Sequence, residues 1–296
     1  MPAEQPFVTL PLLESEMLRI IDTALQEDLG TGDVTTDNLI DPSWQAEGVF
    51  YAKDDGVLAG IPVAAAIFRR VDANIVFTPL LHDGDRVTRG ELIGRMTGPA
   101  ASILRAERVA LNFMQRLSGV ATETARYVEE VRDLPVRITE TRKTTPGLRS
   151  LEKYAVRVGG GHNHRQNLAD GVLIKDNHLE ALALAGYSIT DAINQCKARV
   201  THMVKIEVEV TSLEQAREAA EAGVDWILLD NMPPERMREA VGVIAGRAKV
   251  EASGGVTLKN LRAVAEAGVD LVSAGALTHS YRALDISVAF NYRVTA

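Results

Sequence analysis

The chain has 296 residues, of which 46% are hydrophobic and 24% charged, and its formal net charge is −8. This composition fits one large or two ordinary globular domains. There is no run of about 18 apolar residues that could cross a membrane and no signal-peptide pattern, and the acidic balance disfavours a nucleic-acid partner. The single cysteine, Cys196, excludes an internal disulfide, so we expect a cytoplasmic protein.

The first predicted element is a helix from about Glu14 to Leu29, because apolar residues recur there at helical spacing. Ser15 is a candidate cap and Gly30 a stop. Residues 45–98 alternate short apolar runs with Gly and Asp turns, which predicts a small β-rich domain. Within it, residues 83–93 are similar to the hairpin of hammerhead folds that carry biotin or lipoate, but the attachment lysine of those carriers is missing nearby.

A long helical stretch follows Pro99 and continues beyond Ser118-Gly119. It has the character of a connector between two domains. We therefore expect an N-terminal α/β domain over residues 1–117, completed by 281–296, and a catalytic β/α domain over 118–280.

The C-terminal half alternates predicted strands with predicted helices. The predicted strands are 136–140, 171–175, 204–210, 225–230, 249–252 and 270–273, and helical segments include 212–222, 235–245 and 258–267. Such alternation predicts a parallel sheet, and this number of units favours a closed β/α barrel.

Positive charge is concentrated in one part of this acidic chain. Residues 137–175 contain eight Arg or Lys and three acidic residues. An island of this kind is suited to gripping a small, highly charged anion, whereas nucleic acid would require a basic face over a whole domain. A solvated basic face is the usual alternative, but Arg142, Lys143 and Lys175 fall at predicted strand ends, and Arg165 lies in the loop between them.

Active sites of β/α barrels form at the carboxyl ends of the strands. The polar groups at these ends include Glu207, Glu209 and Asp230. By period-two alternation we expect only one of the two glutamates to face inward, and we prefer Glu209, which is nearer the strand end. Glu209 and Asp230 suit the hydroxyls of a ribose or Mg²⁺. The alternative is that each caps a neighbouring helix.

The last two predicted strands end in small residues that resemble a phosphate cradle. These are Ser253-Gly254-Gly255 and Ser273-Ala274-Gly275. Small residues allow backbone N–H groups to approach an oxyanion, and barrels often bind phosphate after their last two strands. Either turn alone is also compatible with a plain tight turn. A metal site at His162, His164 and His178 is disfavoured, because no Cys or carboxylate completes a convincing ligand set.

Several motifs together resemble the quinolinate phosphoribosyltransferase family. They are Glu27–Thr36, Thr141-Arg-Lys-Thr-Thr-Pro-Gly-Leu-Arg149, Gly159-Gly-Gly-His-Asn-His-Arg165, Leu173-Ile-Lys-Asp-Asn-His178, Glu207-Val-Glu-Val210, Leu228-Leu-Asp-Asn231 and Gly275-Ala-Leu-Thr-His279. The resemblance covers roughly residues 15 to 290. It implies an N-terminal α/β hammerhead-like sandwich domain on an incomplete parallel β/α barrel. His162 departs from the family pattern, which has a small or apolar residue there.

The resemblance implies transfer of phosphoribosyl from phosphoribosyl pyrophosphate to quinolinate with Mg²⁺, giving nicotinate mononucleotide, pyrophosphate and CO₂. It assigns quinolinate to Arg142, His164, Arg165 and Lys175, with Arg108 contributed by the partner subunit of a homodimer. Thr141 is also expected to bind substrate. Lys143 serves the pyrophosphate. Glu209 and Asp230 hold the ribose, and 253–255 and 273–275 hold its 5′-phosphate. Lys143, Glu209 and Asp230 are the expected catalytic residues, and no tightly bound organic cofactor is expected.

Two other functions stay open on the sequence. One is a related phosphoribosyltransferase for another small acid, such as the paralogue linked to molybdenum transport genes. The other is a non-catalytic anion-binding homologue. Retention of Lys143, Glu209 and Asp230 argues against the second, because a protein that only binds dicarboxylates does not require a sugar-phosphate site.

Overall fold

The computed structural model describes residues 14–293, which form two compact units. The first contains 14–125, 145–160 and 281–293, and the second contains 126–144 and 161–280. This division places 118–125 and 145–160 in the first unit, whereas the sequence-based boundary places them in the barrel. Residues 1–13 and 294–296, which the expected N-terminal domain includes, lie outside the described part. Within residues 14–293 no helix is long and apolar enough to cross a membrane.

The first unit is built on a small antiparallel sheet. Its strand order is β12 (Ile286–Arg293), β1 (Gln45–Ala52), β5 (Leu92–Pro99) and β3 (Val76–Pro79), and β2 (Gly56–Val57) pairs separately with β4 (Arg86–Val87). The expected β-rich domain is confirmed. The expected hairpin over 83–93 is wrong, because β4 pairs with β2 while β5 joins β1 and β3.

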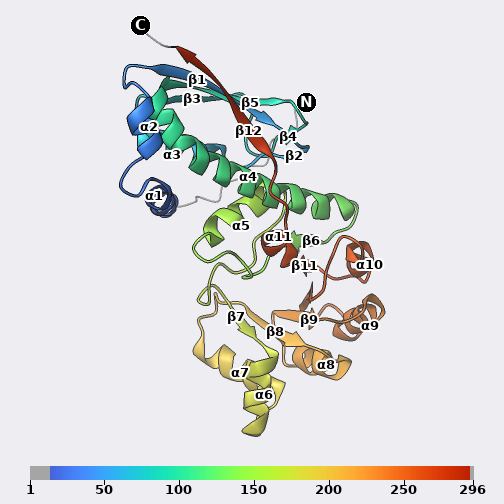
Figure 1. Ribbon diagram of the computed structural model, residues 1–296. Helices are drawn as coiled ribbons and strands as arrows, with labels where there is room; N and C mark the ends of the chain where they lie inside the picture. The colour runs from blue at the N-terminus through green and yellow to red at the C-terminus, as the bar shows by residue number, and fades with distance from the viewer. Residues whose placement is uncertain (1–13, 294–296) are drawn as a thin grey trace. The chain divides into compact units, whose positions relative to one another are not determined.

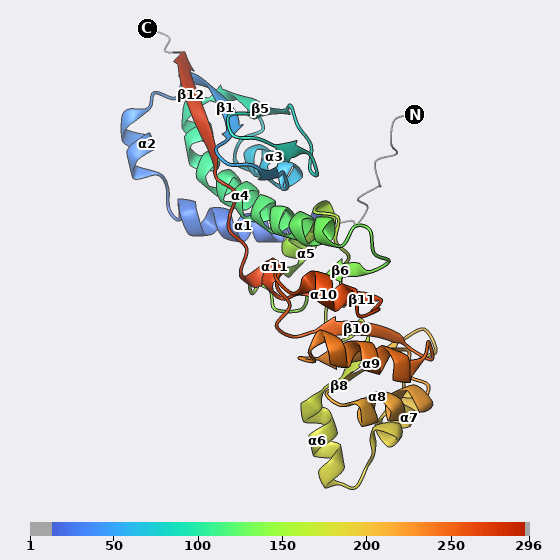
Figure 2. The ribbon, with the colours of Figure 1, turned by 90° about the vertical axis from the view of Figure 1, so that its right-hand side faces the viewer.

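The helices of this unit are α1 (Glu14–Leu29), α2 (Val34–Leu39), α3 (Ile61–Val71), α4 (Ala100–Glu130) and α5 (Arg149–Val158). The helix α4 runs along the sheet in both views (Figures 1 and 2), and α3 packs against β3. The helix over Glu14–Leu29 is confirmed, although Ser15 lies inside it and does not cap it. Phe50, Phe68 and Phe77 pack together with ring centroids 5.4 to 5.9 Å apart, and each such pair contributes about 0.5–1.5 kcal/mol.

The helix α4 continues without a break through Ser118 and Gly119. The Ser118 hydroxyl accepts a hydrogen bond of 2.9 Å from the N–H of Ala59. A Cβ on residue 119 would lie 2.5 Å from the carbonyl oxygen of Arg282, so glycine lets a second chain segment cross the helix closely. The Ser-Gly pair therefore serves packing and does not interrupt the helix.

The second unit contains a parallel sheet of six strands. These are β6 (Arg137–Thr139), β7 (Val172–Ile174), β8 (Ile206–Val210), β9 (Trp226–Asp230), β10 (Lys249–Ser253) and β11 (Leu271–Ser273). Their order is β6-β11-β10-β9-β8-β7, and within the described residues no ladder joins β7 to β6. The closed barrel that the alternation favours is thus wrong, and the incomplete barrel implied by the resemblance is confirmed.

Helices connect these strands and cover the outside of the sheet. They are α6 (Asp176–Leu184), α7 (Ile189–Arg199), α8 (Leu213–Glu221), α9 (Pro234–Ile244), α10 (Leu261–Ala265) and α11 (Ala276–His279). The helix α7 packs against β8 and α8 against β8 and β9, while α8 also packs between α7 and α9, which follow one another in Figure 2. Because all six strands are parallel, their carboxyl ends meet at one edge of the sheet, and the loops there form the candidate site.

Candidate active site

A cleft of about 540 Å³ opens at the carboxyl ends of the strands in the second unit. Its cationic wall contains Thr141, Arg142, Lys143, His164, Arg165 and Lys175. Its second wall contains Glu209, Asp230, Ser253, Gly254, Gly255 and Ser273. Twelve of the predicted site residues thus share one cavity, although they come from seven separate parts of the chain.

Two arginines of the cationic wall lie close together. Burial, and then the positive charge of Arg142, lowers the pKa of Arg165. The Nε of Arg142 is buried and has no hydrogen-bond partner among the described residues. The two neighbouring guanidinium groups repel each other, and the unused donor of Arg142 is free to bind an anion with several oxygens.

A buried carboxylate holds the segment that carries Arg165. Glu140 follows β6 and is fully buried. It accepts a hydrogen bond of 2.9 Å from the side-chain amide of Asn163 and one of 3.0 Å from the N–H of His164. The N–H of His162 also donates to the carbonyl of Ile138 at 2.8 Å. The Asn-His-Arg segment is therefore fixed beside the end of β6.

The opposite wall concentrates acidic groups. Burial raises the pKa of Glu209, the cation of Lys175 opposes this rise, and the negative charges of Asp230 and Asp176 add to it. The Nζ of Lys175 lies 3.7 Å from Oε2 of Glu209. Asp176, which directly follows Lys175 at the end of β7 and to which the sequence assigned no role, also lines the cleft. Three carboxylates with one nearby lysine form a suitable environment for a divalent cation or sugar hydroxyls.

The turn after β10 has the backbone of an anion cradle. Gly254 and Gly255 have φ values of +87° and +63°, which favour glycine. The hydroxyl of Ser273 donates a hydrogen bond of 2.9 Å to that of Ser253, and this links the ends of β10 and β11.

Three predicted residues lie apart from the lining of this cleft. Ala274 is 2% exposed, and Gly275 directly precedes α11 with the side chain of Lys143 beside it. Neither lines the cleft. Arg108 is an exposed residue of α4, in the part of that helix that belongs to the first unit.

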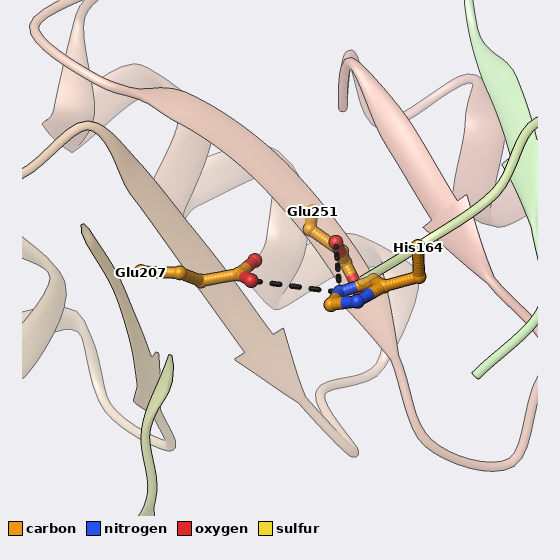
Figure 3. A group of neighbouring side chains, drawn as sticks. All are labelled: His164, Glu207 and Glu251. Carbon is orange, nitrogen blue, oxygen red and sulfur yellow. Dashed lines mark ion pairs between the residues drawn. The ribbon is translucent and has the colours of Figure 1, made fainter. Parts of the chain in front are cut away.

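A cluster that the strand-end analysis missed lies at the floor of the cleft. The imidazole of His164 lies between the carboxylates of Glu207 and Glu251, and both carboxylates point toward the ring (Figure 3). The expectation that only one of Glu207 and Glu209 faces inward is wrong. Residues two apart on a strand share a face, so both glutamates of β8 lie on the cleft side.

The protonation of this cluster follows from its burial. Burial alone lowers the pKa of His164, but Glu207 and Glu251 outweigh this effect and raise it. Burial, and then the charge of Glu251, raises the pKa of Glu207 to about 7. The raised pKa of His164 by itself would favour a proton on both ring nitrogens. The backbone N–H of Arg165 donates to Nδ1 of His164 at 2.8 Å, which opposes a proton on Nδ1 and leaves this second proton to the carboxylates.

The same three residues are the only group of three His, Cys, Asp or Glu side chains within residues 14–293 whose ligand atoms lie within 4.8 Å of one another. The disfavoured metal site at His162, His164 and His178 does not correspond to such a group. His178 uses its Nδ1 to accept a hydrogen bond of 2.9 Å from the N–H of Lys175. A separate cavity of about 630 Å³ in the first unit is lined by residues such as Arg19, Arg116 and Tyr281 and by none of the predicted site residues.

Known proteins resemble the chain over nearly its whole length. The model for the N-terminal domain of quinolinate phosphoribosyl transferase matches residues 33–118, and that for the C-terminal domain matches residues 120–289. The probable nicotinate-nucleotide pyrophosphorylase (carboxylating) of Bacillus subtilis is 45% identical over 276 residues, which are 92% of this chain and 93% of that protein.

Solved structures agree with the sequence comparison. NadC of Streptococcus pyogenes superposes with a TM-score of 0.90 at 43% identity, covering 96% of this chain and 99% of its own. The nicotinate-nucleotide pyrophosphorylase of Francisella tularensis gives a TM-score of 0.88 at 35% identity, with 94% and 96% covered.

Proposed function

The chain belongs to the quinolinate phosphoribosyltransferase family, and we propose that its cleft binds quinolinate and phosphoribosyl pyrophosphate side by side. The enzyme transfers the phosphoribosyl group to quinolinate with decarboxylation, giving nicotinate mononucleotide, pyrophosphate and CO₂ in de novo NAD biosynthesis. The observation that carries the assignment of the cleft is the pair Arg142 and Arg165, two guanidinium groups that line the same cleft, where the charge of Arg142 acts on Arg165 and the buried Nε of Arg142 has no hydrogen-bond partner among the described residues.

Quinolinate is assigned to the cationic wall. Its two adjacent carboxylates match Arg142 and Arg165, because a guanidinium binds a carboxylate through two parallel hydrogen bonds. Thr141, His164 and Lys175 complete this side of the cleft. Binding the dicarboxylate would remove the repulsion between the two arginines, which favours a dianion over a monocarboxylate such as nicotinate.

Phosphoribosyl pyrophosphate is assigned to the other side. Glu209 and Asp230 face the ribose, and Lys143 serves the pyrophosphate. The 5′-phosphate is received by the turn 253–255 together with Ser273, the one residue of 273–275 that lines the cleft. Asp176, Glu209 and Asp230 place three neighbouring negative charges on this side of the cleft. Their carboxylate oxygens are suitable ligands for Mg²⁺. Mg²⁺ bound with this substrate would neutralise charge on the pyrophosphate. No tightly bound organic cofactor is part of the proposal.

The chemistry needs mainly positioning and charge. The ring nitrogen of quinolinate attacks the anomeric carbon, the bond to pyrophosphate breaks, and positive charge develops on the ribose. Glu209 and Asp230 stabilise that charge and Lys143 the leaving group. The quaternary ring nitrogen then accepts the electron pair left at C2 when the bond to CO₂ breaks, and a proton replaces the carboxylate.

The quaternary arrangement and location belong to the same proposal. A homodimer would allow the exposed Arg108 of one subunit to complete the quinolinate site of its partner, and we place the enzyme in the cytoplasm. Isologous dimers are the commonest closed assemblies, and they use the same surface twice.

Release of CO₂ tests the function directly. Purified protein with phosphoribosyl pyrophosphate and Mg²⁺ is expected to release CO₂ from quinolinate and to form nicotinate mononucleotide. Nicotinate and other pyridine carboxylates serve as competitors and alternative substrates. Turnover of another acid in place of quinolinate would identify the protein as a related transferase, and binding without turnover would identify it as an anion-binding homologue.

A further inference from the structure

His164 is held by two glutamates from different strands of the barrel. Its Nε2 lies 3.5 Å from Oε2 of Glu207 on β8 and 3.4 Å from Oε2 of Glu251 on β10 (Figure 3). Glu207 is 9% exposed and Glu251 is 1% exposed. The second carboxylate oxygen of each, Oε1, is buried without a hydrogen-bond partner among the described residues. Such groups are costly to bury unless they have a definite role.

The orientation of the ring follows from its other nitrogen. The backbone N–H of Arg165 donates to Nδ1 at 2.8 Å, so Nδ1 carries no proton and the ring proton is on Nε2, facing the two carboxylates. A metal-bound histidine normally donates a hydrogen bond from its other ring nitrogen, and here that nitrogen accepts. The arrangement therefore favours a hydrogen shared between His164 and the carboxylates over a metal ion.

Both ring nitrogens are thus engaged inside the protein. Through Nδ1 the ring holds the main chain of Arg165, whose guanidinium donates a hydrogen bond of 3.1 Å to the carbonyl of Gly171. Glu140 holds the same segment from the side of β6. Burial and the charge of Arg142 lower the pKa of Arg165, whereas the negative charge of Glu207 raises it. Glu207 therefore helps to keep the Arg165 guanidinium charged.

We propose that Glu207 and Glu251 are positioning residues that fix the His164 ring and, through it, set Arg165 for the dicarboxylate substrate. The inference rests on the proposed function, since it takes the cationic wall to be the quinolinate side. Its consequence is specific. Loss of either carboxylate should weaken quinolinate binding and leave the site of phosphoribosyl pyrophosphate intact.

Steady-state kinetics of Glu251→Ala test this division. The KM for quinolinate is expected to rise about 10- to 100-fold, as for loss of a hydrogen bond to a charged group. The KM for phosphoribosyl pyrophosphate should stay within about twofold and kcat within about threefold, because these rest on other residues. Glu251→Gln keeps an oxygen that can accept from Nε2 and should recover much of the affinity. Glu239→Ala removes an exposed carboxylate on α9 and should change nothing.

A double-mutant cycle tests whether the glutamate acts through the histidine. In a His164→Phe background, Glu251→Ala should add little to the KM for quinolinate, because the intermediary is already missing. At neutral pH, ¹⁵N spectra of histidine-labelled protein should show His164 protonated at Nε2 and unprotonated at Nδ1. Thermal melting of each variant separates loss of folding from loss of affinity.

Three results would overturn the proposal. They are an unchanged KM for quinolinate in Glu251→Ala, an equal rise in both KM values, and one equivalent of metal per chain in wild type that is lost in Glu251→Gln. Absence of quinolinate turnover by the wild type would instead reject the proposed function itself. The two failures are therefore distinguishable from the same set of assays.

Discussion

The side-chain amide of Asn231 donates a hydrogen bond of 2.7 Å to Oδ2 of its neighbour Asp230. Asn231 has a left-handed φ of +52°, which is uncommon for a residue with a side chain and costs about 1 kcal/mol or more. The N–H of Asn231 donates to the carbonyl of Ser253 at 3.0 Å. In this conformation the Asn231 amide fixes the orientation of the Asp230 carboxylate. Gly254, in the turn after β10, leaves the space that the Asn231 side chain occupies.

Gly254→Ala should disturb this relationship. A Cβ at Gly254 would lie 2.4 Å from the side-chain oxygen of Asn231, so the amide must move away from Asp230. We expect the KM for phosphoribosyl pyrophosphate to rise about tenfold or more, with quinolinate affinity less affected. Gly246→Ala is the matched control, because its φ is also positive, at +72°, and nothing lies within 4 Å of its added Cβ. Equal kinetic loss in both variants would attribute the effect to backbone strain alone.

Arg142→Ala should abolish most of the activity with quinolinate. Removing one of the two guanidinium groups is expected to lower kcat/KM by about 30- to 1,000-fold, which corresponds to about 2–4 kcal/mol. Arg142→Lys keeps the charge but loses the paired donors, so it should recover only part of this loss. Arg236→Ala on α9 is the control for an exposed arginine. Intact turnover in Arg142→Ala would remove Arg142 from the site.

Glu209→Gln should act on the chemical step. Loss of a negative charge beside the developing cation on the ribose is expected to lower kcat by about 10²- to 10³-fold, with a smaller change in the KM for quinolinate. Single-turnover experiments with saturating substrates check the effect on chemistry. A change confined to the KM for quinolinate would instead place Glu209 on the dicarboxylate side.

The pH dependence of the protein's stability should reflect the raised pKa of Glu207. Its folded pKa of about 7 lies above the ordinary value of 4.5, so the folded protein keeps a proton that the unfolded chain has already lost. This contribution to stability is present below the ordinary value and is lost as pH rises through about 7. The Tm of Glu207→Gln relative to wild type should therefore increase between about pH 5 and about pH 8. Glu239→Gln should show no such trend.

Mixing two inactive variants tests the proposed contribution of Arg108 across a dimer. Arg108→Ala and Arg142→Ala, unfolded and refolded together, should regain about a quarter of wild-type activity, because half of the dimers are mixed and each mixed dimer has one intact site. Refolding each variant separately provides the control. No recovery in a mixture that forms mixed dimers would place Arg108 outside the partner's site.

The sequence by itself determined the elements and most of the residues in the cleft. The six barrel strands and the helix over Glu14–Leu29 follow from local periodicity, which depends only on neighbouring residues. The cations Arg142, Arg165 and Lys175 lie together because parallel strands present their carboxyl ends at one edge. This rule requires no knowledge of distances.

The tertiary structure decided which buried groups face one another. His164, Glu207 and Glu251 are distant in sequence, and their meeting depends on strand register and on the path of the segment after Glu140, which no local pattern encodes. The same holds for the open edge between β6 and β7 and for the space that Gly254 leaves for Asn231. Strand periodicity specifies which face a side chain occupies, but only the packed sheet specifies what lies opposite it.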